Sequence, residues 1–495
     1  MKRLLTVLGV LVTAIVVLGA VMVWRTSNWG GGDTDASFQL PDPPNIDPQI
    51  AAEALGQAIR FETVTYEDGD PKPGEDQAWL DLHAFLKDRY PLIHDVAPPE
   101  LVAGHTLLFT WQGSDPSLQP IILMAHQDVV PVNPGTESDW EHGPFGGVVT
   151  DGYIWGRGAM DDKGSVIALL EAAEALLRVG WRPKRTIILL FGHDEEVSGS
   201  GARAAFELLK SREVDPFMVV DEGFFVLDDN PITGGPTGLI GVAEKGSVTL
   251  QITAHTEGGH SSRPPLNSGA VRIARAITAL DEHQMPMDLS RPPFSDMIKS
   301  LADNLPYTTR LALANQWLLG DLVKAQMQAD ASAAAMARTT TAPTMMSGSI
   351  KQNVLPQRAN ATVNFRIHPN DSIEKVVEHV KDVTRDIPDL SVEIAGGIGS
   401  EPSPVSATSG PAWDILKAIA QVTGDGAPVA PALVIAATDA RFASAISKDA
   451  VYRFVPAIYG DEDLAGFHGT NERLSVDNLG RMIRGYSQLM QAASP

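Results

Sequence analysis

The stretch that decides the fold is TIILLFGHDEE, residues 186–196. Its apolar part has the length of a strand buried on both faces, and it leads directly to Glu195 and Glu196. Two further apolar runs end in the same way: 121–125 is followed by His126 and Asp128, and 217–220 is followed by Asp221. Three such strands predict a sheet with acidic and histidine side chains gathered at one edge.

The segments between these strands have helical patterns, at residues 165–179 and 201–209. Each is long enough to cross over between parallel strands. The sequence therefore predicts an α/β domain with a doubly wound, mostly parallel sheet. In such sheets ligands bind beyond the carboxyl ends of the strands, which is where the acidic and histidine residues fall.

A different pattern follows, in which Val248, Leu250 and Ile252 alternate with polar residues, as in a strand with one exposed face. We expect a ferredoxin-like α+β domain at 246–396, inserted as a lid or dimerisation domain. Its Ala- and Met-rich helical insertion, 281–341, is expected to pack, and a pocket wall for an apolar acyl group is the alternative. The predicted elements are strand 247–253, helix 268–280, strands 343–352 and 361–368, helix 372–386 and strand 390–395.

The catalytic domain is consequently predicted to be discontinuous, with residues 50–245 before the inserted domain and residues 397–495 after it. A strand-like segment, 450–459, leads to His468. The final helix begins after Ser475, whose hydroxyl can cap its first turn.

The N-terminal 25 residues have the pattern of a transmembrane helix. Lys2 and Arg3 precede an uncharged run from Leu4 to Trp24, and its 21 residues match the roughly 30 Å hydrocarbon core of a bilayer. The basic residues before the run favour a cytoplasmic N-terminus and a periplasmic or extracellular catalytic part. A cleaved signal peptide, which would give a secreted protein, is the alternative. Residues 26–49 are rich in Gly, Asp and Pro and are expected to form a flexible linker.

Composition excludes several kinds of chemistry and partner. The chain has no cysteine, so His and carboxylates are the strong metal ligands that remain. A formal net charge of −23 repels the phosphate backbone, so no nucleic-acid partner is expected. The sequence also lacks a Gly-x-Ser-x-Gly motif, which argues against a serine hydrolase.

Three motifs carry chemistry. The HQD triplet puts His126 and Asp128 on one face of a strand end, where the carboxylate can orient the imidazole. In WGRGAMDDKG, residues 155–164, adjacent carboxylates lie in a glycine-bracketed turn, where one could bridge two cations and one could cap the following helix. The adjacent like charges of Glu195 and Glu196 are costly at the end of a buried strand unless cations or solvent offset them.

Together these motifs resemble the two-zinc metallopeptidase family of aminoacylase, acetylornithine deacetylase, succinyl-diaminopimelate desuccinylase and carboxypeptidase S. Within that family the likeness is greatest to carboxypeptidase S and the N-fatty-acyl-amino-acid synthase/hydrolases. The segments that carry the resemblance are, in chain order, MAHQDVVP, WGRGAMDDKG, GHDEEVSGSGA, VVDEG, GGHSSRPP, NVLPQRANATVNFR and FHGTNE.

The resemblance implies a site for two zinc ions, with Co²⁺ or Mn²⁺ as substitutes, in which Asp161 bridges the two metals. Three carboxylates would offset three of the four positive charges, and the remaining charge would acidify a water molecule. The implied ligands are His126, Asp161 and Asp221 for one zinc and Asp161, Glu196 and His468 for the other.

The resemblance also implies roles for residues around the metals. Asp128 would orient His126, and Glu195 would be the general acid/base that accepts a proton from water and returns it to the leaving nitrogen. Asp162 would follow the bridging carboxylate through an unusual peptide bond. His193 matches no ligand position.

From the inserted domain, the resemblance implies that His260 stabilises the oxyanion across a dimer interface and that Asn353 and Arg366 bind the substrate carboxylate. Arg366 alternates with apolar residues, so it points off the packed face, where its guanidinium could pair with a carboxylate; a surface salt bridge is the alternative. The segment TDAR, residues 438–441, also resembles a family segment near the substrate, and both substrate contact and domain packing remain open for it.

The implied function is hydrolysis of the amide bond next to a free carboxylate, by a metallocarboxypeptidase or an N-acyl-amino-acid amidohydrolase. The expected partners are a small peptide or N-acyl amino acid substrate, a membrane through the N-terminal helix, and a second copy through the lid. An aminopeptidase of the same architecture is disfavoured, because a free substrate amine calls for an acidic partner where Arg366 is expected. A non-catalytic binding or assembly member of the family would have no need of Glu195.

Overall fold

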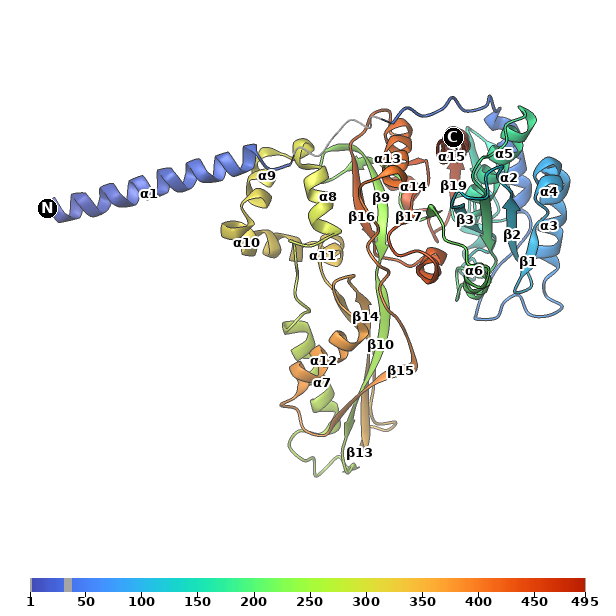
Figure 1. The fold of residues 1–495 in the computed structure, drawn as a ribbon. Coiled ribbons are helices and arrows are strands. Elements are labelled where there is room, and N and C mark those ends of the chain that lie inside the picture. Colours follow the sequence, from blue (N-terminus) through green and yellow to red (C-terminus); the bar gives the residue numbers. More distant parts are fainter. Residues whose placement is uncertain (1, 31–37, 495) are drawn as a thin grey trace.

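The computed structural model describes residues 2–30 and 38–494; Met1, the predicted linker residues 31–37 and Pro495 lie outside the described residues. Ten described strands form one sheet in the order β1-β2-β6-β3-β7-β17-β9-β8-β18, with β16 paired to β9 (Figure 1). The strands are β1 (Glu100–Val102), β2 (Thr106–Trp111), β3 (Ile121–His126), β6 (Ile187–Gly192), β7 (Met218–Asp221), β8 (Val226–Asn230), β9 (Gly235–Glu244), β16 (Val429–Val434), β17 (Val451–Arg453) and β18 (Ile458–Tyr459).

This main sheet is parallel at its centre, where β6, β3, β7 and β17 are neighbours. Antiparallel pairs join β1 to β2, β2 to β6 and β8 to β9, so the sheet is mixed. Strands β3 and β6 are buried along their whole length, because helices cover both faces of the sheet. One face carries α2 (Pro48–Ile59), α5 (Lys163–Arg178), α13 (Pro411–Thr423) and α15 (Val476–Ala492), and the other carries α6 (Ser200–Ser211) and η3 (Asp439–Ala445).

The doubly wound α/β core predicted from the apolar runs is therefore present. The hydroxyl of Ser475 caps α15 by accepting a hydrogen bond from the backbone N–H of Asn478, as predicted. Outside the main sheet lie α3 (Gln77–Arg89), α4 (Pro91–Val96), η1 (Glu137–Asp139), α14 (Asp461–Leu464) and a small sheet of β4 (Val148–Thr150), β5 (Tyr153–Trp155) and β19 (Arg473–Ser475).

A second sheet has the strand order β12-β14-β10-β15, and every neighbouring pair in it is antiparallel. Two helices cover one face, where Val248, Leu250 and Ile252 are buried in alternation with more exposed residues. This is the predicted β-α-β-β-α-β order. Its elements are β10 (Gly246–His255), α7 (Gly269–Glu282), β12 (Thr340–Ser347), β14 (Arg358–Ile367), α12 (Ile373–Thr384) and β15 (Leu390–Ser400), with β11 (Gly259–His260) and β13 (Val354–Leu355) paired at its distal end.

The helical insertion between α7 and β12 packs against the main sheet rather than within the second one. Its apolar residues form a cluster with Leu239 of β9 and with Ala430 and Ala432 of β16. Packing is thus the role that the structure shows for most of the insertion. Its helices are α8 (Phe294–Ser300), η2 (Ala302–Asn304), α9 (Tyr307–Ala314), α10 (Gln316–Gln328) and α11 (Ala331–Ala337).

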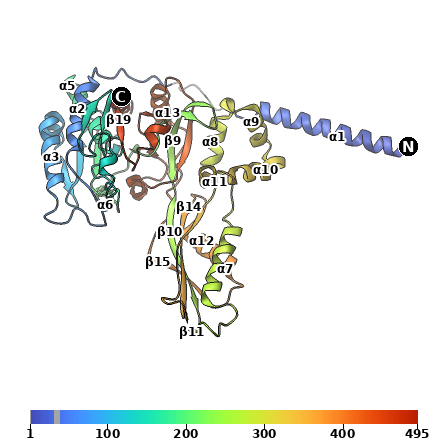
Figure 2. The same cartoon turned by 180° about the vertical axis from the view of Figure 1, so that it is seen from behind.

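The N-terminal helix α1 (Lys2–Ser27) projects away from the rest of the chain, and both views show only its C-terminal end near α9 and α10 (Figures 1 and 2). It is the one described helix long and apolar enough to cross a membrane. The prediction of a flexible linker over 26–49 is wrong for residues 38–47. Phe38, Leu40 and Ile46 pack on the main core, and Gln488 donates a hydrogen bond to the carbonyl of Pro41.

Candidate metal centre

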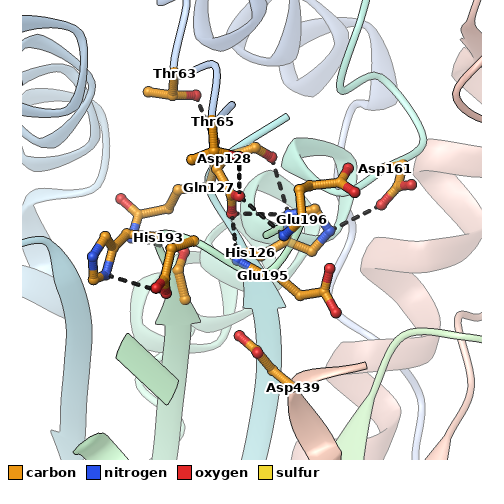
Figure 3. Close-up of polar contacts among 12 residues, drawn as sticks. Thr63, Thr65, His126, Gln127, Asp128, Asp161, His193, Glu195, Glu196 and Asp439 are labelled. Carbon is orange, nitrogen blue, oxygen red and sulfur yellow. Dashed lines mark hydrogen bonds and ion pairs between the residues drawn. The ribbon is translucent and has the colours of Figure 1, made fainter. Parts of the chain in front are cut away.

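Four side chains that are distant in the sequence meet at the carboxyl edge of the main sheet. His126 ends β3, Glu196 follows β6, Asp161 lies in the turn before α5, and His468 lies in the loop before β19. His126 Nε2 is 2.9 Å from Asp161 Oδ1 (Figure 3). On the other side of the same carboxylate, His468 Nε2 is 3.1 Å from Asp161 Oδ2 and 3.2 Å from Glu196 Oε2. The structure thus brings together four of the five residues predicted as metal ligands.

The fifth position requires a correction. Asp221 was predicted as a ligand, but its Oδ2 accepts a 2.8 Å hydrogen bond from the backbone N–H of Ala440, on the sheet face that η3 covers. The next residue, Glu222, places Oε1 3.5 Å from His126 Nε2. Ligand atoms of His126, Asp162 and Glu222 all lie within 4.8 Å of one another, so Glu222, and not Asp221, lies among the described groups that could hold a cation.

Asp128 holds the end of β3 and the segment after β6 in fixed positions. Its carboxylate accepts hydrogen bonds from the Thr65 hydroxyl at 2.9 Å and from the backbone N–H groups of Glu195 and Glu196 at 3.1 Å (Figure 3). His126 Nδ1 lies 3.0 Å from the Asp128 carbonyl oxygen and 3.4 Å from Oδ1. Although burial opposes its charge, the hydrogen bonds from His126 and these other donors lower the pKa of Asp128. This geometry suits the orienting role predicted for it.

The cluster has the chemistry of a cation site. Both carboxylate oxygens of Asp162 and Oε1 of Glu196 are buried without a hydrogen-bond partner among the described residues. Burial and, after it, the Asp161 carboxylate raise the pKa of Glu222 to about 7. Imidazole nitrogens and carboxylate oxygens are ligands that zinc accepts, and a cation would offset their repulsion. The residues present therefore fit a metal centre. The peptide bond between Asp161 and Asp162, which was expected to be unusual, is cis.

Glu195 lies beside this cluster, but it is not among the described residues whose ligand atoms are close enough to hold one cation together. Its Oε1 is 3.7 Å from Nη1 of Arg441, in the TDAR segment. Burial and the carboxylate of Asp439 raise the pKa of Glu195 well above its ordinary value. The Asp439 carboxylate leaves no room for side chains at Gly192 and Gly199, where an added Cβ would lie 2.4 and 2.2 Å from its oxygens. TDAR thus packs directly against the segment that contains Glu195.

Glu472 organises the turn that presents Asp161, a role the sequence analysis did not assign. Its Oε1 accepts the backbone N–H groups of Gly158, Met160 and Asp161 at 3.0, 2.9 and 3.2 Å. Its Oε2 pairs with Nη1 of Arg157 at 2.6 Å, and both side chains are buried. The signal was present in the sequence, because Glu472 closes the FHGTNE motif that contains His468.

Replacing Glu472 with Ala is expected to lower the free energy of unfolding by about 3–5 kcal/mol, because it leaves a buried guanidinium without its partner. Glu462 is the matched control, since it pairs with Arg473 at 3.2 Å but is 89% exposed. Glu462→Ala should change stability by no more than about 1 kcal/mol. Denaturant unfolding of the two variants measures both values, and equal losses would contradict the role given to Glu472.

Of the residues predicted from the inserted domain, His260 and Asn353 lie away from the cluster within one chain. His260 in β11 and Asn353 beside β13 line one cavity at the distal end of the second sheet (Figure 1). Arg366 is exposed and lies near the opposite end of β14, eight residues from Arg358, which corresponds to about 26 Å along a strand. A single chain therefore does not gather all three residues. His193, which was assigned no ligand position, hydrogen-bonds to Thr106 instead.

The fold and the site define a class of protein. A cluster of imidazole and carboxylate ligands at the carboxyl edge of an α/β sheet, with a further carboxylate beside it, is the arrangement of a metal-dependent hydrolase. Such an enzyme needs a ligand set for the cation and a separate proton acceptor, and the cluster and the neighbouring Glu195 have the chemistry for these two parts.

Comparison with known proteins identifies the family. Residues 122–492 match Peptidase family M20/M25/M40. The chain is 35% identical to human N-fatty-acyl-amino acid synthase/hydrolase PM20D1, over 99% of this chain and 97% of that protein. It is 32% identical to carboxypeptidase S of Saccharomyces cerevisiae, over 88% of this chain and 82% of that protein. The M20 family metallo-carboxypeptidase Sso-CP2 from Sulfolobus solfataricus shares the fold, with a TM-score of 0.61, 18% identity and coverage of 90% and 99%. The chain belongs to the M20/M25/M40 peptidase family, which confirms the predicted metallopeptidase or amidohydrolase class.

Proposed function

We propose that this enzyme hydrolyses the amide bond of N-acyl amino acids, next to their free carboxylate, with two zinc ions. The observation that carries the proposal is the position of Asp161, whose two carboxylate oxygens face His126 and His468 separately. A carboxylate with a histidine on each side is suited to bridge two cations. The similarity to human N-fatty-acyl-amino acid synthase/hydrolase PM20D1 over nearly the whole chain supports an N-acyl amino acid substrate.

The ligands divide into two sets around the bridging Asp161. His126 and Glu222 would hold one zinc, and Glu196 and His468 would hold the other. When bound, the two ions would polarise the scissile carbonyl and lower the pKa of a water molecule. Metal removal with a chelator should therefore abolish turnover, and added zinc should restore it.

The side chains of the protein supply the proton transfers and the fixed geometry. Glu195 would accept the proton of the attacking water and return it to the leaving nitrogen. Asp128 orients His126. Its carboxylate also accepts hydrogen bonds from the backbone N–H groups of Glu195 and Glu196, which holds the backbone of both residues in place. Arg441 lies 3.7 Å from Glu195 and would offset part of the rise in the pKa of Glu195 that burial and Asp439 cause.

Arg366 would bind the carboxylate of the substrate, and a matched substrate pair tests this function. The wild-type protein should hydrolyse N-acyl amino acids and their dipeptide analogues much faster than the same compounds with an amidated carboxyl group. Arg366→Ala should lower kcat/KM for free acids by about 10- to 100-fold, the loss of one charge-assisted contact, without affecting amides. Arg385→Ala, at an exposed arginine that follows α12 in the same domain, is the control. Equal losses on acids and amides would contradict a carboxylate contact, and faster cleavage of dipeptides would favour a peptidase.

We further propose that two copies pair through the second sheet, so that His260 and Asn353 serve the metal centre of the other copy. Edge strand β12 exposes Met345 and Met346, and Ile350 and Leu266 are also exposed near this distal end. Monomeric proteins rarely expose such apolar groups together.

Complementation between two inactive variants tests this arrangement. Glu195→Gln and His260→Ala should each be inactive alone, but co-expression should restore activity because a mixed dimer contains one site with both residues intact. Activity that stays absent in a preparation shown to contain mixed dimers would contradict the shared site.

The apolar helix α1 would anchor the enzyme, with its catalytic part on the exported side of the membrane. All its apolar side chains from Leu4 to Leu11 are exposed, as expected for a helix that meets lipid rather than protein. A cleaved signal segment remains the alternative, and the mass of the mature chain distinguishes the two.

A further inference from the structure

Helix α10 exposes apolar side chains next to the end of the N-terminal helix. It has no buried residue, although Val323 and Met327 on one side pack against the core of the insertion. The opposite side presents Leu318 and Leu322, which are 45% and 64% exposed. Trp317 precedes them at 56% exposure. A helix that packs with one face and leaves large apolar groups on the other has a surface without a partner among the described residues.

The junction between α9 and α10 is bonded to the last turns of α1. The Asn315 side chain, which is fully buried, donates hydrogen bonds to the carbonyl oxygen of Met22 and to the hydroxyl of Thr26, both at 3.2 Å. Arg25 donates through Nε to the carbonyl of Ala314 at 3.3 Å. These bonds fix the start of α10 relative to the end of α1 (Figures 1 and 2).

The same bonds set the depth of α10 relative to the apolar run. That run ends at Trp24, and Arg25 is the first charged residue after it, so the boundary between hydrocarbon and water falls near these two residues. Asn315 binds on both sides of this boundary, at Met22 and Thr26. Trp317 and Arg25 line one cavity, which puts Trp317 at the same level.

We propose that α10 lies on the lipid headgroup layer, with Trp317, Leu318 and Leu322 inserted at the membrane surface. The proposal rests on the membrane span proposed for α1, because that span brings a bilayer to the level of Asn315. Tryptophan favours this interface, and an exposed apolar helix face gains from burial there. Because the insertion also packs on β9 and β16, this contact would hold the catalytic sheet in one orientation beside the membrane, where N-acyl amino acids with long acyl chains partition.

The absence of cysteine from the chain makes a direct test clean, since each introduced thiol is unique. Leu322→Cys probes α10, Val12→Cys probes α1, and Leu101→Cys in β1 is the matched control, an exposed leucine far from the N-terminal helix (Figure 1). Each full-length variant is labelled with an environment-sensitive fluorophore, reconstituted into phosphatidylcholine vesicles, and titrated with lipids that carry a quencher near the headgroup or deep in the acyl chain.

We expect the label at 322 to shift its emission to the blue and to lose fluorescence to the headgroup quencher, while the label at 101 does neither. The label at 12 should respond to the deep quencher. If 12 responds but 322 matches 101, the anchor stands and the surface contact is wrong. If 322 is blue-shifted but not quenched by either lipid, protein covers α10, and the inference is also wrong. If neither 12 nor 322 responds, the anchor itself fails, and the surface contact fails with it.

Discussion

Replacement of Glu195 by Gln is expected to lower kcat by about 10²- to 10⁴-fold, the usual cost of losing a general acid/base. In the wild type, the backbone N–H of Glu195 donates a hydrogen bond to Asp128, and the Glu195 carboxylate faces Arg441. Glu195 is not among the described residues that could hold a metal ion together. Gln keeps the shape of the side chain but cannot accept a proton. The variant should therefore keep its metal while it loses turnover, which separates proton transfer from metal binding.

The measurement pairs steady-state kinetics on a free-acid N-acyl amino acid with the zinc content of the same preparation. Glu207→Gln is a matched control on an exposed position of α6, and it should behave as the wild type in both assays. A Glu195→Gln enzyme with normal kcat would remove Glu195 from the mechanism. Loss of zinc together with activity would instead assign it to the metal site.

The architecture could be predicted from the sequence because its periodicities are regular over whole elements. Residues 187–191 and 121–125 are uninterrupted apolar runs with polar groups close behind them, and they lie in neighbouring parallel strands whose ends coincide. The alternation at Val248, Leu250 and Ile252 likewise specified a sheet with one covered face. Local composition was a poorer guide at residues 38–47. Gly and Pro suggested a linker there, but three apolar side chains gain enough by burial to bind that segment to the core.

The site was predictable at most positions of the motifs, but the choice between Asp221 and Glu222 was not. Asp221 and Glu222 have similar chemistry, and the choice between them depends on which one the surrounding backbone satisfies. The deciding contact comes from Ala440, 219 residues later in the chain, whose backbone N–H donates a hydrogen bond to the Asp221 carboxylate. Periodicity within VVDEG contains no information about that contact. The distal positions of His260 and Asn353 likewise follow from the length of the second sheet, which their motifs do not encode.

Substitutions at Asp221 and at Glu222 are expected to differ strongly in their effect on zinc binding. Glu222→Gln removes a charged oxygen that faces His126 at 3.5 Å, so it should weaken zinc binding by more than the roughly 10- to 100-fold that loss of an outer partner costs. Asp221→Asn keeps an oxygen that can accept from Ala440. It should leave zinc affinity nearly unchanged and lower the free energy of unfolding by about 1 kcal/mol, because a neutral acceptor replaces a charged one.

Competition with a chromophoric chelator gives both zinc affinities, and denaturant unfolding of the metal-free proteins gives both stabilities. The two variants are each other's control, since they remove one charge at neighbouring positions of the same strand end. The electrostatic change is thus nearly equal, and only the direction of the side chain differs. If Asp221→Asn releases zinc while Glu222→Gln retains it, binding of the metal must reverse the orientation of the two side chains at the end of β7.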